Sequence, residues 1–130
     1  MYVRLVAAAA VLVSAGVHLK LWFDFAHDLH VVGPAFLVNV VAGIVIAGLL
    51  VFWKHWLAPL LAAGFGASTL GAFTIATTSL GLFGDHEKWL VPYVFTAAIA
   101  EIVAIVAGLY AASREVRSTE PARERTAVRT

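Results

Sequence analysis

One carboxyl group, that of Glu101, stands in the middle of a long apolar run from Trp89 to Ala112. Alanines lie three or four positions away on either side, with Gly108 one turn further, so we expect this side of a helix to pack against other helices. An ionised carboxylate facing lipid at mid-depth would cost at least about 2.5 to 3.5 kcal/mol. We therefore expect Glu101 to face the interior of a bundle, either protonated or hydrogen-bonded.

Two roles for Glu101 fit the sequence. It can hydrogen-bond a serine or threonine across the bundle as a structural contact, or it can bind a ligand, an ion or a proton. Counting about 1.5 Å per residue from the expected outer boundary places further polar side chains at two depths, which would form a polar track down to Glu101 if they face one outward-open cleft. Alternatively, the hydroxyl groups bond to carbonyls of their own helices. The upper group, roughly 8 Å deep, comprises His18, Asn39, Thr77 and Thr78, and the lower group, roughly 14 to 18 Å deep, comprises Ser14, Thr74 and Glu101.

A second set of polar residues lies in the two loops expected on the outer face. Their carboxylates and imidazoles are ligands that suit Zn or Cu(II), although interfacial loops also favour these residues for ordinary solvation. His18 and His86 could instead supply the two axial ligands of a b-type haem. The candidate metal ligands are Asp24, His27, Asp28 and His30 in the first loop and Asp85, His86 and Glu87 in the second.

The composition indicates that these residues lie on or between helices that span a membrane. Of 130 residues, 62% are hydrophobic and 13% are charged, which lies far outside the range of soluble globular proteins. Four apolar runs are long enough to cross a bilayer, so we predict an all-α, four-helix transmembrane bundle in residues 1–112. The Arg- and Glu-rich residues 113–130 are predicted to be a disordered tail. The predicted spans are residues 3–23, 34–53, 57–83 and 89–112.

The distribution of positive charge predicts the orientation in the cell membrane. Arg4, Lys54 and the five arginines of the tail fall on one side, whereas Lys20 and Lys88 fall on the other. By the positive-inside rule, both termini are predicted to be cytoplasmic. A net charge of +1 gives no reason to expect nucleic acid as a partner, and the absence of cysteine excludes disulfides, thiolate metal sites and dithiol oxidoreductases.

Three sequence strings carry a resemblance to a known group. SAGVHLKLWFD, GPAFLVNVVAGIV and GLFGDHEKW precede a last helix that bears a glutamate. Together they resemble small four-span membrane proteins of high-GC Gram-positive bacteria, loosely similar to the DoxX-like group. The resemblance covers about Arg4 to Tyr110 and implies the four-helix fold, with no activity or catalytic residues to transfer.

Three hypotheses for function follow. The first is a non-catalytic accessory subunit or self-associating bundle, because the short spans leave little room for a shielded active site and the third and fourth helices carry more small-residue faces than one core needs. The second is an outward-open module that binds or transports a small molecule, an ion or a proton at Glu101. The third is a metal- or haem-binding membrane protein that uses the histidines of the outer face. Lipid and other membrane subunits, or a second copy, are the expected partners.

Overall fold

Four long helices make up most of the chain in the computed structural model, which describes residues 2–24, 26–76 and 92–128, with the side chains of residues 76, 92–94 and 120–128 excepted. Each helix contains a segment that is long and apolar enough to cross a membrane. The prediction of an all-α bundle with four spanning helices is thereby confirmed. The elements are α1 (Tyr2–Asp24), the short 3-10 helix η1 (Ala26–Asp28), α2 (Val32–Phe52), α3 (Leu57–Ala76) and α4 (Pro92–Val128).

Local sequence signals set the ends of the helices. Prolines lie in the first turns of α2, α3 and α4, where a missing backbone N–H costs nothing. At the end of α2, Trp53 is extended, and its N–H donates to the Leu49 carbonyl at 2.8 Å. The His55 ring nitrogen Nδ1 accepts the Leu57 N–H at 3.2 Å, which satisfies one of the free donors at the start of α3. The turn from Trp53 to Trp56 therefore joins two antiparallel helices.

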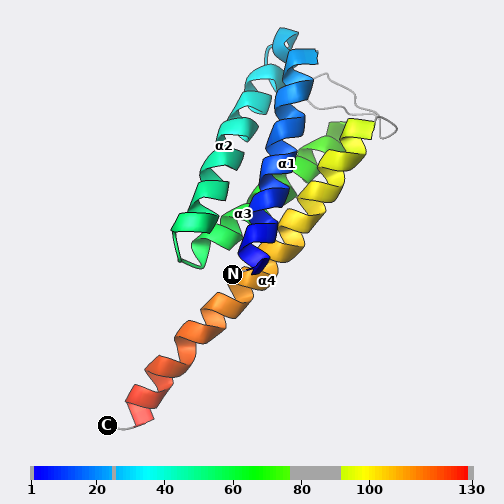
Figure 1. Cartoon of the computed structure of the whole chain (residues 1–130). Helices are drawn as coiled ribbons and strands as arrows, with labels where there is room; N and C mark the ends of the chain where they lie inside the picture. Colours follow the sequence, from blue (N-terminus) through cyan, green and yellow to red (C-terminus); the bar gives the residue numbers. More distant parts are fainter. Residues whose placement is uncertain (1, 25, 77–91, 129–130) are drawn as a thin grey trace.

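The helices run alternately up and down, and they do not pack evenly (Figure 1). α1 packs closely against both α2 and α4, and α4 packs closely against α3. By contrast, α2 approaches α3 less closely and makes no close backbone approach to α4 within the described residues. As a result, α2 lies at the periphery of the bundle.

Glycines permit the close helix contacts. A Cβ added to Gly66 of α3 would lie 2.6 Å from the Glu101 carbonyl oxygen, and one added to Gly108 of α4 would lie 2.5 Å from the Pro59 carbonyl oxygen. Between α1 and α2, a Cβ on Gly43 would lie 2.8 Å from that of Ala15. Such close approach of backbones is the usual basis of helix association in membranes, where burial of apolar surface gives little driving force.

Small side chains dominate the core as well. The buried cluster consists mainly of alanines, with Val11, Leu50 and Phe65 as its larger members. Large apolar side chains instead face outward along the helices, as expected where lipid covers the surface. On α2 these outward residues include Leu37, Val38, Val41, Ile44 and Val45.

The last helix is longer than the sequence predicts. Residues 113–130 are predicted to be disordered, whereas α4 continues as a helix to Val128 and extends past the other helices (Figure 1). Arginines and glutamates that recur three or four residues apart favour a helix here, and Glu115 is also held by an ion pair with Arg4. The division into a transmembrane domain of residues 1–112 and a separate tail stays a prediction.

Candidate functional site

Glu101 lies in the interior of the bundle, as predicted. Its side chain is only 2% exposed, and the fully buried Ser14 of α1 donates its hydroxyl hydrogen to Glu101 Oε1 over 3.2 Å. The alanines one turn away on α4, Ala97, Ala98 and Ala104, are buried on the same side. Glu101 is therefore hydrogen-bonded to a serine across the bundle, Ser14, and a role in binding a ligand, an ion or a proton stays a prediction.

His18 is connected to the same serine through its main chain. The His18 ring nitrogen Nδ1 lies 2.8 Å from the carbonyl oxygen of Ser14, one turn earlier on α1. Because a carbonyl oxygen can only accept, Nδ1 must carry the hydrogen, and the other ring nitrogen of a neutral imidazole, Nε2, is then an acceptor. The ring also packs edge-on against Phe36 of α2, with 4.9 Å between the ring centres. His18 thus bridges α1 and α2 beside the Ser14–Glu101 pair.

A second polar pair, Asn39 and Thr69, joins α2 to α3. Asn39 Nδ2 donates to Thr69 Oγ1 at 2.9 Å, and the Thr69 hydroxyl donates to the Phe65 carbonyl at 2.8 Å. The single hydroxyl hydrogen is used by Phe65, so Thr69 can only accept from Asn39. This fixes the orientation of the amide, and its oxygen Oδ1 is buried with no hydrogen-bond partner in the described part of the chain.

The two pairs lie about one helical turn apart along the bundle, one level with the apolar layer around Phe65 and one to the side of it. A Cβ on Gly43 would lie 3.5 Å from the Phe65 ring, and Asn39 and Thr69 are one turn further toward the η1 end of the bundle on α2 and α3 respectively. On the other side, the closely packed Gly66 lies against the Glu101 backbone. All four helices therefore contribute to what we call the polar layer, which consists of Ser14, His18, Asn39, Thr69 and Glu101.

The predicted threonines do not all take part in this layer. Thr74 is exposed, and its hydroxyl donates to the Leu70 carbonyl of its own helix at 2.8 Å. For Thr74, the alternative of a bond to its own helix is thus confirmed. Thr77 and Thr78 lie outside the described residues. Thr69 was not among the predicted site residues, although it occupies the position that the threonines further along the chain were expected to fill.

Between α1 and α2, the predicted metal ligands make ordinary polar contacts. Asp24 Oδ2 pairs with Lys20 Nζ at 3.0 Å. His27 Nδ1 lies 2.9 Å from the Trp22 carbonyl oxygen, and His27 Nε2 lies 3.4 Å from Asp28 Oδ1. Among the described residues, no three His, Asp or Glu side chains form a group that could hold a metal ion.

The rest of the metal and haem predictions rest mainly on residues 85–87. Asp85, His86 and Glu87 lie outside the described residues, and His30 is exposed. The haem hypothesis needs His86 as the partner of His18, so it too depends on these residues. The Zn or Cu site and the b-type haem site stay predictions.

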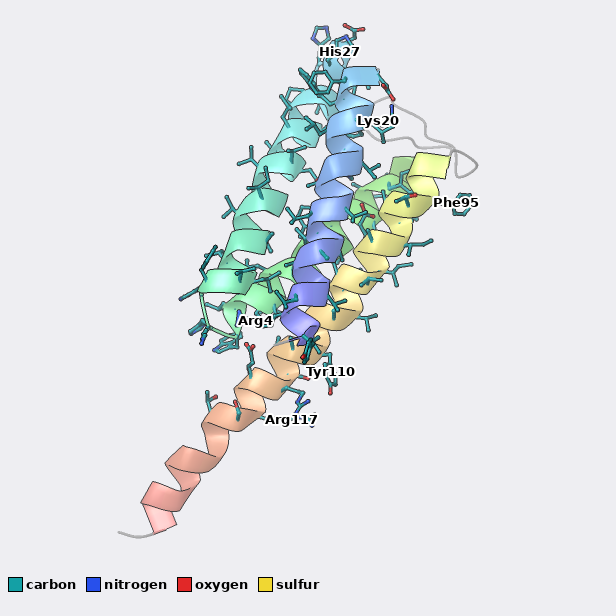
Figure 2. The ribbon with its side chains drawn as sticks, viewed as in Figure 1. Arg4, Lys20, His27, Phe95, Tyr110 and Arg117 are labelled. Carbon is teal, nitrogen blue, oxygen red and sulfur yellow. The ribbon has the colours of Figure 1, made fainter. Side chains whose placement is uncertain are left out.

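Arg4 forms a buried polar contact at the opposite end of the bundle from Lys20 and His27 (Figure 2). It is 6% exposed, and its Nη2 donates to the carbonyl oxygens of Trp53 and His55 at 2.7 and 3.3 Å. Its Nη1 lies 3.3 Å from Glu115 Oε1 on α4. The sequence analysis used Arg4 only as a charge that sets orientation, whereas its side chain ties α1 to the α2–α3 turn and to α4.

Comparison with known proteins adds no family to this description. A scan against protein-family models, a search of curated proteins and a search of solved structures each found no match. The resemblance to DoxX-like proteins therefore stays a prediction. By its four apolar helices and their packing, the chain is a small multi-pass helical membrane protein.

Proposed function

We propose that this protein is a non-catalytic, self-associating transmembrane bundle whose contact surface is the outer face of α3. The observation that carries the proposal is a row of small, exposed residues on that face, which we call the α3 face: Gly64, Ala67, Ser68 and Gly71. A Cβ added to Gly64 or Gly71 would meet no atom of the described residues within 4 Å.

The spacing of these residues favours contact with another helix. Gly64 and Ser68, and likewise Ala67 and Gly71, are four residues apart, the spacing that lets two helix backbones approach closely in a membrane. The opposite side of the same helix uses small residues in this way inside the bundle, where Ala63 faces Gly108 of α4. α3 therefore has one small-residue face that is used internally and a second that no other described residue covers closely at Gly64 and Gly71.

A second copy of the chain is the occupant that fits the α3 face best. Its residues are small and carry no charge, so the same face on two copies can meet around a two-fold axis without burying an unpaired charge. The Ser68 hydroxyl already donates to the Phe65 carbonyl at 3.0 Å, so it needs no new partner at such a contact. The bulky outward residues of α2, such as Val38 at 67% exposed, fit lipid instead.

Energy transfer between labelled copies in liposomes tests the proposal. We expect transfer that rises with the protein-to-lipid ratio and an association at least about tenfold weaker in Gly64→Leu and Gly71→Leu. Gly16→Leu and Gly48→Leu are matched controls, because they add the same side chain at open positions on α1 and α2. The controls should associate like the unsubstituted protein.

Two results would count against self-association. One is a monomer at every protein-to-lipid ratio, and the other is equal weakening in the α3 variants and in the controls. Stoichiometric recovery with a larger membrane protein, lost in Gly64→Leu and Gly71→Leu only, would assign the α3 face to an accessory-subunit contact in place of a contact between copies.

A further inference from the structure

The turn between α2 and α3 places four consecutive side chains with nitrogen donors next to one another. We call this segment the aromatic turn: Trp53, Lys54, His55 and Trp56. It lies between two helices that are long and apolar enough to cross a membrane, Val32–Phe52 and Leu57–Ile75. Because tryptophan and lysine at the ends of membrane spans lie among the lipid headgroups, we expect these donors at the depth of the lipid phosphates.

The backbone of the aromatic turn is held in one conformation by hydrogen bonds. Arg4 Nη2 donates to the carbonyl oxygens of Trp53 and His55 at 2.7 and 3.3 Å. The His55 N–H donates to the Trp53 carbonyl at 2.8 Å, and the Ala58 N–H donates to the His55 carbonyl at 3.1 Å. The side chains of the turn therefore project from a fixed backbone, which lowers the entropy that a bound ligand would cost.

The ring of His55 is fixed as well, and it has one unused donor. It stacks on Trp53 with 4.9 Å between ring centres and 12° between planes, and its centre lies 5.5 Å from that of Trp56. Its Nδ1 accepts the Leu57 N–H at 3.2 Å, so the hydrogen of the neutral imidazole is on Nε2. Within the described part of the chain, Nε2 has no hydrogen-bond partner and is not buried. It can therefore donate to an anionic oxygen from outside the bundle.

The charges around the aromatic turn leave one positive charge unbalanced. Arg4 is paired with Glu115, with 3.3 Å between Nη1 and Oε1. Lys54 is exposed and forms no ion pair with any described side chain. A lipid phosphodiester carries one negative charge, so it would neutralise Lys54 without leaving an excess of either sign. The exposed Phe52, directly before the turn, offers an apolar surface for the acyl chains, which a free phosphate ion lacks.

We propose that the aromatic turn binds the phosphate group of an anionic phospholipid. Lys54 supplies the counter-charge, and His55 Nε2 donates a hydrogen bond to a phosphate oxygen. Arg4 is a positioning residue, because it holds the backbone of the turn and does not itself need to reach the lipid. The site is separate from the α3 face, so the failure of one proposal leaves the other standing.

Quenching of tryptophan fluorescence by brominated lipids tests the site in the full-length protein. In a background of Trp22→Phe and Trp89→Phe, Trp53 and Trp56 are the only tryptophans of the chain. Phosphatidylcholine liposomes contain increasing fractions of brominated phosphatidylglycerol or, for comparison, of brominated phosphatidylcholine. The ratio of the two quenching curves gives the preference for the anionic lipid beside the turn. We expect a preference of about fivefold, the factor that one lysine at an anionic headgroup contributes.

Variants assign the preference to the aromatic turn. Lys54→Gln should reduce it to less than about twofold, and Lys54 is exposed, so the fold should be retained. His55→Asn keeps an oxygen that can accept the Leu57 N–H but is too short to place a donor where Nε2 lies, so an intermediate preference is expected. Arg117→Gln is the matched control, because it removes the same charge from an exposed position of α4 two residues after Glu115 and should leave the preference unchanged.

Three results would overturn the proposal. The first is equal quenching by the two brominated lipids in the background protein. The second is an equal loss of preference in Lys54→Gln and Arg117→Gln, which would show a diffuse attraction to positive charge in place of a local site. The third concerns the source of the phosphate: inorganic phosphate, added at constant ionic strength, should leave the quenching unchanged. If it displaced the brominated phosphatidylglycerol, the site would belong to free phosphate and not to a lipid.

Discussion

The Glu101 carboxyl is buried, with alanines one turn away on α4, and it accepts a hydrogen bond from Ser14 of α1. We expect Glu101→Gln to lower the free energy of unfolding by no more than about 1 kcal/mol, because an amide has the same shape and still accepts from Ser14. Glu101→Lys should cost at least about 2.5 to 3.5 kcal/mol, because it brings an unpaired ammonium to mid-depth.

Denaturant unfolding in micelles checks both values for Glu101. Ser14→Ala is the complementary variant, since it leaves the buried carboxyl oxygen without its donor and should cost about 1 to 3 kcal/mol. If Glu101→Lys were as stable as the unsubstituted protein, the side chain at this position would have to reach water, and the buried carboxyl described above would be wrong.

At the scale of residues, the sequence analysis identified Glu101, Ser14 and Asn39 as candidate site residues but did not identify Thr69. The expected depths on the third span were counted from an outer end at Phe83, so Thr77 and Thr78 were placed level with Asn39. The turn between α2 and α3 sets the register instead: Asn39 is fourteen residues before Trp53, and Thr69 is twelve after Leu57. Because the two helices are antiparallel, counting from this turn brings Asn39 and Thr69 together.

At the scale of elements, the glycines of the α3–α4 contact determine how closely these helices pack. Gly108→Ala would place a methyl group 2.5 Å from the Pro59 carbonyl oxygen and 2.8 Å from the Ala63 nitrogen, so the two helices would have to separate. We expect a loss of about 1 to 3 kcal/mol in the free energy of unfolding. Gly48→Ala is the matched control, because it meets no atom within 4 Å and should be neutral or stabilising by up to about 1 kcal/mol. Chemical denaturation of the two variants side by side measures the difference, and equal stability would contradict the close α3–α4 packing.

The side chain of Arg4 holds α1, the α2–α3 turn and α4 together. We expect Arg4→Gln to cost about 2 kcal/mol or more, because it removes the charged donor that Trp53, His55 and Glu115 share, even though the two carbonyls keep their backbone donors. Arg117→Gln, on the exposed side of α4, should change stability by less than about 0.5 kcal/mol.

A double-mutant cycle isolates the ion pair that Arg4 forms with Glu115. Combining Arg4→Gln with Glu115→Gln should cost less than the sum of the two single changes, by about 0.5 kcal/mol or more, because the residues are in direct contact. Strictly additive costs would mean that the helical extension of α4 is not held to the bundle through this pair.

At the scale of the whole molecule, hydropathy was sufficient to predict the number and type of the long secondary-structure elements. Four runs of bilayer length can satisfy their backbone groups only as helices, so the fold class follows from composition. The packing does not follow from it, because the peripheral position of α2 depends on which small residues meet: Gly43 with Ala15, and Gly66 and Gly108 across α3 and α4. The continuation of α4 to Val128 was also missed, since low hydrophobicity indicates solvent exposure and not the absence of a helix.

The distribution of charge predicts how the whole molecule is oriented in the membrane. Because the chain contains no cysteine, single introduced cysteines can measure this orientation. The structure brings the start of α1, the α2–α3 turn and Glu115 of α4 to one end, through the contacts of Arg4, and this end carries most of the positive charge. By the positive-inside rule it should face the cytoplasm.

We therefore expect a membrane-impermeant thiol reagent, applied to intact bacterial cells, to label Asp28→Cys but neither Lys54→Cys nor Thr119→Cys, and to show the opposite pattern on inverted vesicles. All three positions are exposed in the structure, so differences in labelling reflect the side of the membrane. Labelling of Lys54→Cys and Thr119→Cys on intact cells would reverse the orientation and place the polar layer, which lies toward the η1 end of the bundle, on the cytoplasmic side of the apolar layer around Phe65.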